Sequence, residues 1–226
     1  MNFHNFYQKW NEQLHKLIHQ LCESTPSKDE ELNHLVNKVM DHYVEYYRVK
    51  ANAAKNDVLA VFAATWCTTL ERSLHWIAGW RPTTAFHLVY TEASLRFETQ
   101  IVDILRGHRS GDLGDLSPAQ FRRVSELQCE TVQEENAISA ELAKWQACNI
   151  VLDGTSDLVG LGMDVERKME RLVAILEKAD HLRLKTAKSL VELLTPYQAV
   201  EFLIAAVQLQ FGVRNWGVDY DRRSRT

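Results

Sequence analysis

Residues 32–50 read LNHLVNKVMDHYVEYYRVK, and the fold class is clearest in this segment. Its apolar side chains recur three and four positions apart from Leu32 to Tyr47, and Lys50 continues the same series. Since an α-helix turns once in about 3.6 residues, this spacing places them all on one face of a long amphipathic helix. No glycine or proline interrupts the stretch. The sequence therefore predicts a helix here, and leaves open whether it runs on or kinks between residues 51 and 62.

The same helical spacing recurs along almost the whole chain. Several helix starts carry a Ser or Thr three residues before a Glu or Gln, a capping box in which both side chains bind free backbone N–H groups. Two of these starts also have a first-turn proline. The capping boxes are predicted at Ser27–Glu30, Thr68–Glu71, Ser117–Gln120 and Thr195–Gln198. The predicted helices cover residues 3–22, 32–50 with its extension, 68–77, 82–105, 117–145, 165–194 and 195–211.

Glycines mark the predicted breaks between these helices. Gly79 suits the left-handed conformation past the end of the short helix. Residues 107–114 hold three glycines and are expected to form a flexible loop, and residues 152–162 are expected to be poorly ordered. Gly212 and Gly217 are expected to close the last helix.

The fold class indicated by this pattern is all-α, a multi-helix bundle of about seven long amphipathic helices. The apolar fraction of 46% is enough to fill a core. We expect one helical domain at residues 1–218, followed by a charged and frayed C-terminal tail at residues 219–226.

The composition restricts the class of protein. A net charge of -4 gives no overall attraction to a nucleic-acid backbone. The 4 cysteines are scattered without metal-knuckle or redox spacing, as expected of reduced thiols inside a cell. No secretory signal is recognisable, and the apolar runs at 58–66 and 202–207 are far shorter than the ~20 residues of a membrane span. We therefore expect a soluble protein of the nucleus or cytoplasm, with no membrane partner.

Three blocks of sequence carry a family resemblance. The first holds Phe6, Tyr7, Trp10 and Gln13; the second spans residues 40–86 and includes WIAGWRP at 76–82. The third comprises ADHLR at 179–183, LTPYQA at 194–199 and VRNWG at 213–217. Together the blocks resemble the delay-of-germination domain of plants, a seed-dormancy domain that also forms part of the TGA-class bZIP transcription factors. The resemblance covers nearly the whole chain.

The resemblance implies a non-enzymatic regulatory domain that binds other proteins. The process would be seed dormancy, abscisic-acid signalling or associated transcriptional control, and the partners protein phosphatases or transcription regulators. The bZIP members place a basic region before this domain, whereas the first 30 residues here hold only Lys9, Lys16 and Lys28 as full positive charges. Direct DNA binding is therefore not expected. Two alternative functions stay open: a DNA-associated transcription regulator, and a sensor of haem or an apolar small ligand. The chain could also form a homo-oligomer.

Five residues are the candidates for contact with a partner protein, although core packing is the alternative for the aromatic ones. Large aromatic side chains and arginines often anchor protein interfaces. Trp80 and Arg81 fall between two predicted helices, where side chains are more often exposed. The other candidates are Tyr7, Trp10 and Trp216.

No catalytic, cofactor or metal residues are predicted. The common motifs for acyl transfer, zinc hydrolysis and nucleotide binding are all missing from the sequence. His15 and His19 are the only histidine pair at helical spacing, and no further ligand completes a metal or haem site. The resemblance implies haem as a cofactor of some members, but it assigns no ligand histidine here. Glu134 and Glu135 are interpreted as solvated surface charges.

Overall fold

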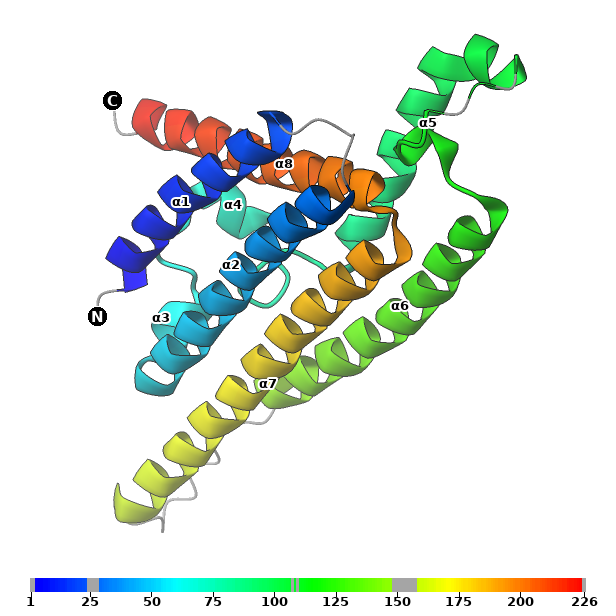
Figure 1. Ribbon diagram of the computed structural model, residues 1–226. Helices are drawn as coiled ribbons and strands as arrows, with labels where there is room; N and C mark the ends of the chain where they lie inside the picture. Colours follow the sequence, from blue (N-terminus) through cyan, green and yellow to red (C-terminus); the bar gives the residue numbers. More distant parts are fainter. Residues whose placement is uncertain (1–2, 24–28, 107, 109, 148–157, 225–226) are drawn as a thin grey trace.

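The computed structural model describes residues 3–23, 29–106, 108, 110–147 and 158–224, and the chain is helical nearly throughout (Figure 1). The predicted all-α bundle is confirmed. The described residues form eight α-helices and one short 3₁₀ helix, with no strand. The elements are α1 (Phe3–Glu23), α2 (Asp29–Asn56), α3 (Val58–Phe62), α4 (Thr69–Ser73), α5 (Thr83–Leu105), η1 (Leu113–Asp115), α6 (Pro118–Ala147), α7 (Leu158–Leu193) and α8 (Pro196–Arg223).

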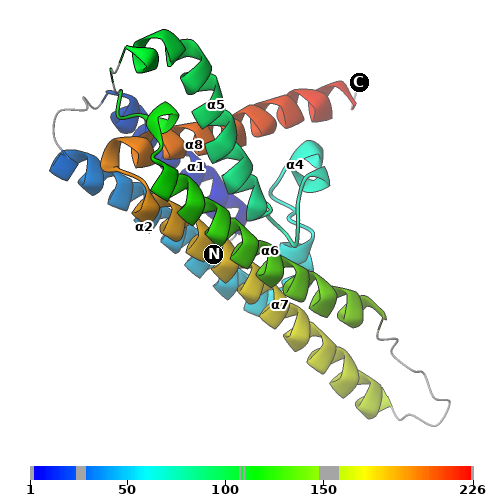
Figure 2. The ribbon, with the colours of Figure 1, turned by 90° about the vertical axis from the view of Figure 1, so that its right-hand side faces the viewer.

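Helix α2 occupies the centre of the arrangement. It packs against α1, α7 and α8, and α7 in turn packs along α6. Figure 2 shows α2, α7 and α6 running side by side. Two exposed ion pairs join α6 to α7, Lys178 with Glu141 at 2.7 Å and Lys185 with Glu134 at 2.5 Å.

The apolar stripes of the helices meet in one continuous core. Five different helices each supply a side chain that is completely buried: Leu14, Val39, Phe86, Leu172 and Val207. Burying a side chain of this size stabilises the fold by about 1.5–3 kcal/mol. The helical periodicity seen in the sequence is therefore the pattern of the core.

Three of the predicted capping boxes are confirmed. Glu71 N–H donates to Thr68 Oγ1 at 3.2 Å, and Thr68 N–H donates to Glu71 Oε2 at 2.7 Å. The same reciprocal pairs start α6 at Ser117 and α8 at Thr195. The fourth predicted box, at Ser27, lies outside the described residues.

The question left open for residues 51–62 is answered by a break in the helix. The chain breaks at Asp57, whose carboxylate accepts the Ala60 N–H at 2.9 Å and starts α3 as a separate helix. Two other predicted helix bounds were wrong. Helix α4 ends at Ser73 instead of continuing to residue 77. Helix α7 begins at Leu158, so the second half of the segment expected to be poorly ordered is helical; residues 148–157 lie outside the described ones.

The two C-terminal glycines do not end α8. The helix continues to Arg223, so most of the predicted frayed tail is helical. Gly217 is buried, and a Cβ added there would lie 2.1 Å from Thr68 Oγ1. This glycine allows α8 to pack closely on the start of α4. A hydrogen bond of 3.1 Å from Thr69 N–H to Asp221 continues the same contact.

The expected flexible loop at residues 107–114 is fixed over its second half. Leu113 is fully buried, and its N–H donates to Glu201 Oε2 of α8 at 2.8 Å. Asp112 is held by Gln100 at 2.8 Å, and its carbonyl accepts from Gln198 at 3.0 Å. The prediction was wrong here because partners distant in sequence supply the hydrogen bonds.

None of the helices in the described part of the chain has both the length and the apolarity needed to cross a membrane.

Candidate functional site

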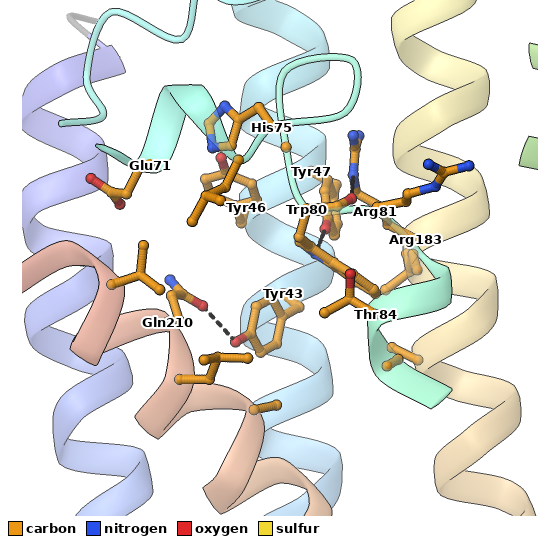
Figure 3. A pocket seen from close by; sticks show the side chains of 18 of the residues that line it. Tyr43, Tyr46, Tyr47, Glu71, His75, Trp80, Arg81, Thr84, Arg183 and Gln210 are labelled. Carbon is orange, nitrogen blue, oxygen red and sulfur yellow. Dashed lines mark hydrogen bonds between the residues drawn. The ribbon is translucent and has the colours of Figure 1, made fainter. Parts of the chain in front are cut away.

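An apolar pocket of about 420 Å³ is lined by α1, α2, α5, α7, α8 and the segment around α4 (Figure 3). Most of its wall is aromatic or aliphatic. A few polar side chains also reach it, as is typical of ligand pockets in proteins. The polar and charged members are Glu71, His75, Arg81, Thr84, Arg183 and Gln210.

Three tyrosines of α2 form the aromatic wall of this pocket. Tyr43, Tyr46 and Tyr47 lie three and four residues apart, so they share one helix face. The Tyr43 hydroxyl donates to Gln210 Oε1 at 3.1 Å, and the Tyr47 hydroxyl accepts from Trp80 Nε1 at 2.9 Å. Burial raises the pKa of all three phenols well above the usual value. They therefore remain neutral, with apolar faces and hydroxyls that can hydrogen-bond.

Two buried cations hold the loop between α4 and α5 that borders the pocket. Arg183 of α7 donates to the carbonyl oxygens of Trp76, Ile77 and Trp80, the last two at 2.9 and 2.7 Å. Lys50 of α2 donates to the Ala78 carbonyl at 2.8 Å. The loop therefore turns four carbonyls inward toward side chains from two other helices.

Asp180 is the shared counter-ion of these cations. Its Oδ1 lies 2.9 Å from Lys50 Nζ and 2.5 Å from Arg183 Nη1. Both cations are almost completely buried. Burial lowers the pKa of Lys50, while the contact with Asp180 opposes that shift. Two positive charges thus share one carboxylate, and both cations also donate to the loop carbonyls.

The backbone of this loop differs from the sequence prediction. Gly79 does not take the left-handed conformation; Ile77 and Ala78 do, with φ of 46° and 57°. Positive φ is rare for a β-branched residue, so tertiary contacts must stabilise it. Gly79 is needed for space instead, because an added Cβ would lie 2.9 Å from Arg183 Cζ.

Arg81 pairs with a carboxylate that the sequence analysis placed in solvent. Its Nε lies 2.7 Å from Glu135 Oε2 of α6, and its side chain is 52% exposed whereas that of Glu135 is 0% exposed. Glu135 also accepts the Thr83 N–H at 2.6 Å and so caps the start of α5. The interpretation of Glu135 as a surface charge was wrong; Glu134 is exposed as expected.

The structure separates the remaining candidate contact residues. Tyr7 and Trp10 are buried, and Trp10 Nε1 donates to the His42 carbonyl at 2.9 Å. Trp80 is partly buried against Tyr47. Trp216 lies far from the loop in sequence and is 73% exposed on α8. The five candidates therefore do not form one surface.

The chemistry of the described residues offers no metal site. No group of three His, Cys, Asp or Glu in the described ranges is placed to hold a metal ion. His15 packs near the Phe211 ring, and His19 lies 3.2 Å from Glu23. Burial, together with Glu71, raises the pKa of Cys67 to about 12, which keeps it a thiol and a poor nucleophile.

Comparison with known proteins places the chain in a family. Residues 13–91 match the family model described as DOG1, seed dormancy control. Protein DOG1-like 4 of Arabidopsis thaliana is 34% identical over 230 residues, covering 95% of this chain and 91% of the relative. This chain belongs to the DOG1-like family. Protein DOG1-like 3 of the same plant is 25% identical over 232 residues, 93% of this chain and 82% of the relative.

The DOG1-like domain is also related to transcription factors. Transcription factor TGA5 of Arabidopsis thaliana is 28% identical over 208 residues, which cover 91% of this chain and 60% of that protein. The family resemblance read from the sequence is therefore confirmed, including the domain shared with TGA factors. It associates the chain with seed dormancy control and transcription.

The residues that hold the loop beside the pocket were not predicted from the sequence. They are Lys50, Asp180, Arg183 and Glu135. One signal was present, since Lys50 falls in the apolar series of α2, where a lysine needs a buried partner. The partner could not be identified, because Asp180 lies 130 positions away.

Proposed function

We propose that this chain is a non-enzymatic regulatory domain that acts by binding other proteins in seed dormancy control and abscisic-acid signalling. The partners proposed are protein phosphatases or transcription regulators of the nucleus or cytoplasm. The family membership and the relation to transcription factors support the process. No direct DNA binding is proposed, because the net charge of -4 does not favour a phosphate backbone.

The observation that carries the proposal is an apolar stripe on the outer face of α8. Leu209, Trp216 and Tyr220 recur seven and four residues apart, so they lie above one another on the helix. All three are exposed. Gly212 lies between them, with open space where a Cβ would be. An exposed tryptophan within an apolar helix face is typical of a protein-binding surface.

The test is capture of partners from seed extract with matched variants. Trp216→Ala/Tyr220→Ala removes the stripe, and Leu59→Ala is the control because Leu59 is an exposed apolar residue of α3. We expect the wild type and the control to retain the same phosphatases or transcription regulators. The double variant should lose them with an unchanged melting temperature. Equal capture by the double variant would exclude this face.

A second candidate function is recognition of an apolar small molecule in the pocket of about 420 Å³. The three tyrosine hydroxyls and Gln210 offer hydrogen bonds at its wall, and the rest is apolar. Such a pocket is the default ligand site of a helical domain. The pocket and the stripe on α8 are compatible within one regulator.

The pocket is tested with an environment-sensitive apolar fluorophore, 8-anilinonaphthalene-1-sulfonate. Ala206→Phe fills the cavity from α8, and Gly212→Ala changes the outer face of the same helix as a control. Saturable binding that the control retains and Ala206→Phe weakens by about tenfold or more is expected. Equal binding by both variants would place the fluorophore elsewhere.

A further inference from the structure

Two serines lie just after arginine pairs. Ser125 ends the stretch RRVS at residues 122–125, and Ser224 lies within RRSR at residues 222–225. Each serine therefore has an arginine two positions before it. Serine kinases with an acidic substrate groove select positive charge beside the hydroxyl, because guanidinium groups pair with the carboxylates of the groove. By sequence alone, both serines are candidates for phosphorylation.

The position of Ser125 within α6 makes it a poor substrate. A kinase binds its substrate segment in an extended conformation, so the helical turns around the serine have to open. Ser125 is the eighth residue of the 30-residue helix α6, and Val124 beside it is completely buried. Its Oγ also lies 3.2 Å from the Tyr90 hydroxyl of α5. Opening this segment would break helical hydrogen bonds on both sides of the serine and expose part of the core.

Ser224 lies at the end of α8, which Figure 2 shows projecting away from the bundle. The helix ends at Arg223, and Ser224 is its C-cap. Both the N–H and the Oγ–H of Ser224 donate to the Tyr220 carbonyl, at 3.0 and 3.1 Å. No side chain from Asp219 to Ser224 is buried. The last turn can therefore open without exposing any of the core, as helix ends commonly do.

We propose that Ser224 is a phosphorylation site for an arginine-directed serine kinase. The arginines beside Ser224 supply the recognition, and its position at the end of α8 supplies the access. In the reaction, Ser224 Oγ attacks the γ-phosphorus of ATP, and the bond from that phosphorus to the bridging oxygen breaks. ADP leaves, and the hydroxyl proton passes to a carboxylate of the kinase. This inference is independent of the functions proposed above.

A phosphate on Ser224 weakens the contact between α8 and α4. Asp221 precedes Ser224 by three residues, so the two side chains are neighbours on the helix surface. The Oδ2 atom of Asp221 accepts the Thr69 N–H at the start of α4, at 3.1 Å. A phosphate repels this carboxylate, stands at the negative end of the helix, and removes the hydroxyl that donates to Tyr220. The last turn of α8 therefore opens more often, and Thr69 loses its partner.

The site is tested on the folded full chain with magnesium, ATP and a recombinant Aurora-type kinase, which selects an arginine two positions before the serine. Ser125 and Ser224 both meet that requirement, so Ser125→Ala is the matched control for Ser224→Ala. We expect Ser125→Ala to take up phosphate at the wild-type rate and Ser224→Ala to be slower by about tenfold or more. Mass spectrometry should map the phosphate to Ser224. No phosphate uptake, uptake at Ser125, or equal uptake by Ser224→Ala would overturn the proposal.

The effect on α4 is tested by hydrogen exchange of the phosphorylated full chain. The amides of Thr69 and of residues 221–224 should exchange about fivefold faster than before phosphorylation. Asp221→Asn keeps an acceptor for Thr69 but removes the repelled charge, so phosphorylation should change Thr69 exchange there by less than about twofold. The amides around Ser125 are the internal control and should not change. Equal exchange of Thr69 before and after phosphorylation of the wild type would overturn the proposed effect on α4.

Discussion

Replacement of Arg183 by methionine should destabilise the fold more than any surface change. The native guanidinium donates to Asp180 and to the carbonyls of Trp76, Ile77 and Trp80. A methionine side chain fills most of the same space but donates no hydrogen bond. Three carbonyls then lose a buried donor, whereas Asp180 keeps its hydrogen bond to Lys50.

The magnitude follows from these contacts. Removing one member of a buried ion pair costs about 3–5 kcal/mol, and each orphaned carbonyl costs about 1–3 kcal/mol. These costs overlap, and Lys50 still compensates Asp180. We therefore expect Arg183→Met to lower the free energy of unfolding by about 4 kcal/mol, or the melting temperature by about 10 °C. Arg183→Lys keeps the charge but not the planar fork, and should lose about 2 kcal/mol.

The assay is urea unfolding followed by circular dichroism and tryptophan fluorescence. Trp76 and Trp80 report on the loop, and coincidence of the two probes tests two-state behaviour. Arg171→Met, an exposed position of the same helix, is the matched control and should change stability by less than about 0.5 kcal/mol. If the free energy of unfolding of Arg183→Met lies within about 1 kcal/mol of the wild-type value, the reasoning is wrong and the loop carbonyls do not depend on this residue.

Three further predictions concern packing, capping and pH. Gly217→Ala should lower stability by about 1–3 kcal/mol, because the new Cβ lies 2.1 Å from the side-chain oxygen of the α4 cap. Gly212→Ala, in open space on the same helix, should raise stability by about 0.5–1 kcal/mol. A higher melting temperature for Gly217→Ala than for Gly212→Ala would contradict the packing argument. Arg81→Ala should lower the free energy of unfolding, measured with urea, by about 1–2 kcal/mol, because Glu135 stays buried without its cation. An unchanged urea midpoint would show that this ion pair does not contribute to stability. Burial, followed by nearby positive charge, lowers the pKa of His75 to about 4. The unfolded chain therefore binds the proton first, and stability should fall as the pH drops from 6.5 toward 4. His75→Gln should flatten that slope in a pH series of melting temperatures; an identical slope would exclude His75 as its source.

The helices could be predicted from the sequence, because the features that form a helix are local. Apolar spacing along α2 identified the face that the core covers, and it did so without knowledge of the neighbouring helices. The boxes at Thr68, Ser117 and Thr195 were equally readable, since donor and acceptor lie three residues apart. Family membership followed from blocks spread over the chain, and the comparisons confirmed it.

The roles of the glycines and of the buried charges depend on contacts between distant parts of the chain. Gly79 and Gly217 looked like helix ends, but each makes room for a group distant in sequence, Arg183 or Thr68. Glu135 looked solvated beside Glu134 and instead caps a helix that starts 52 positions earlier. The burial of a side chain depends on which elements pack against it, and the local sequence does not specify those elements. The loop at the pocket is therefore set by Lys50 and Arg183, whose meeting with its carbonyls depends on the packing of α2 against α7.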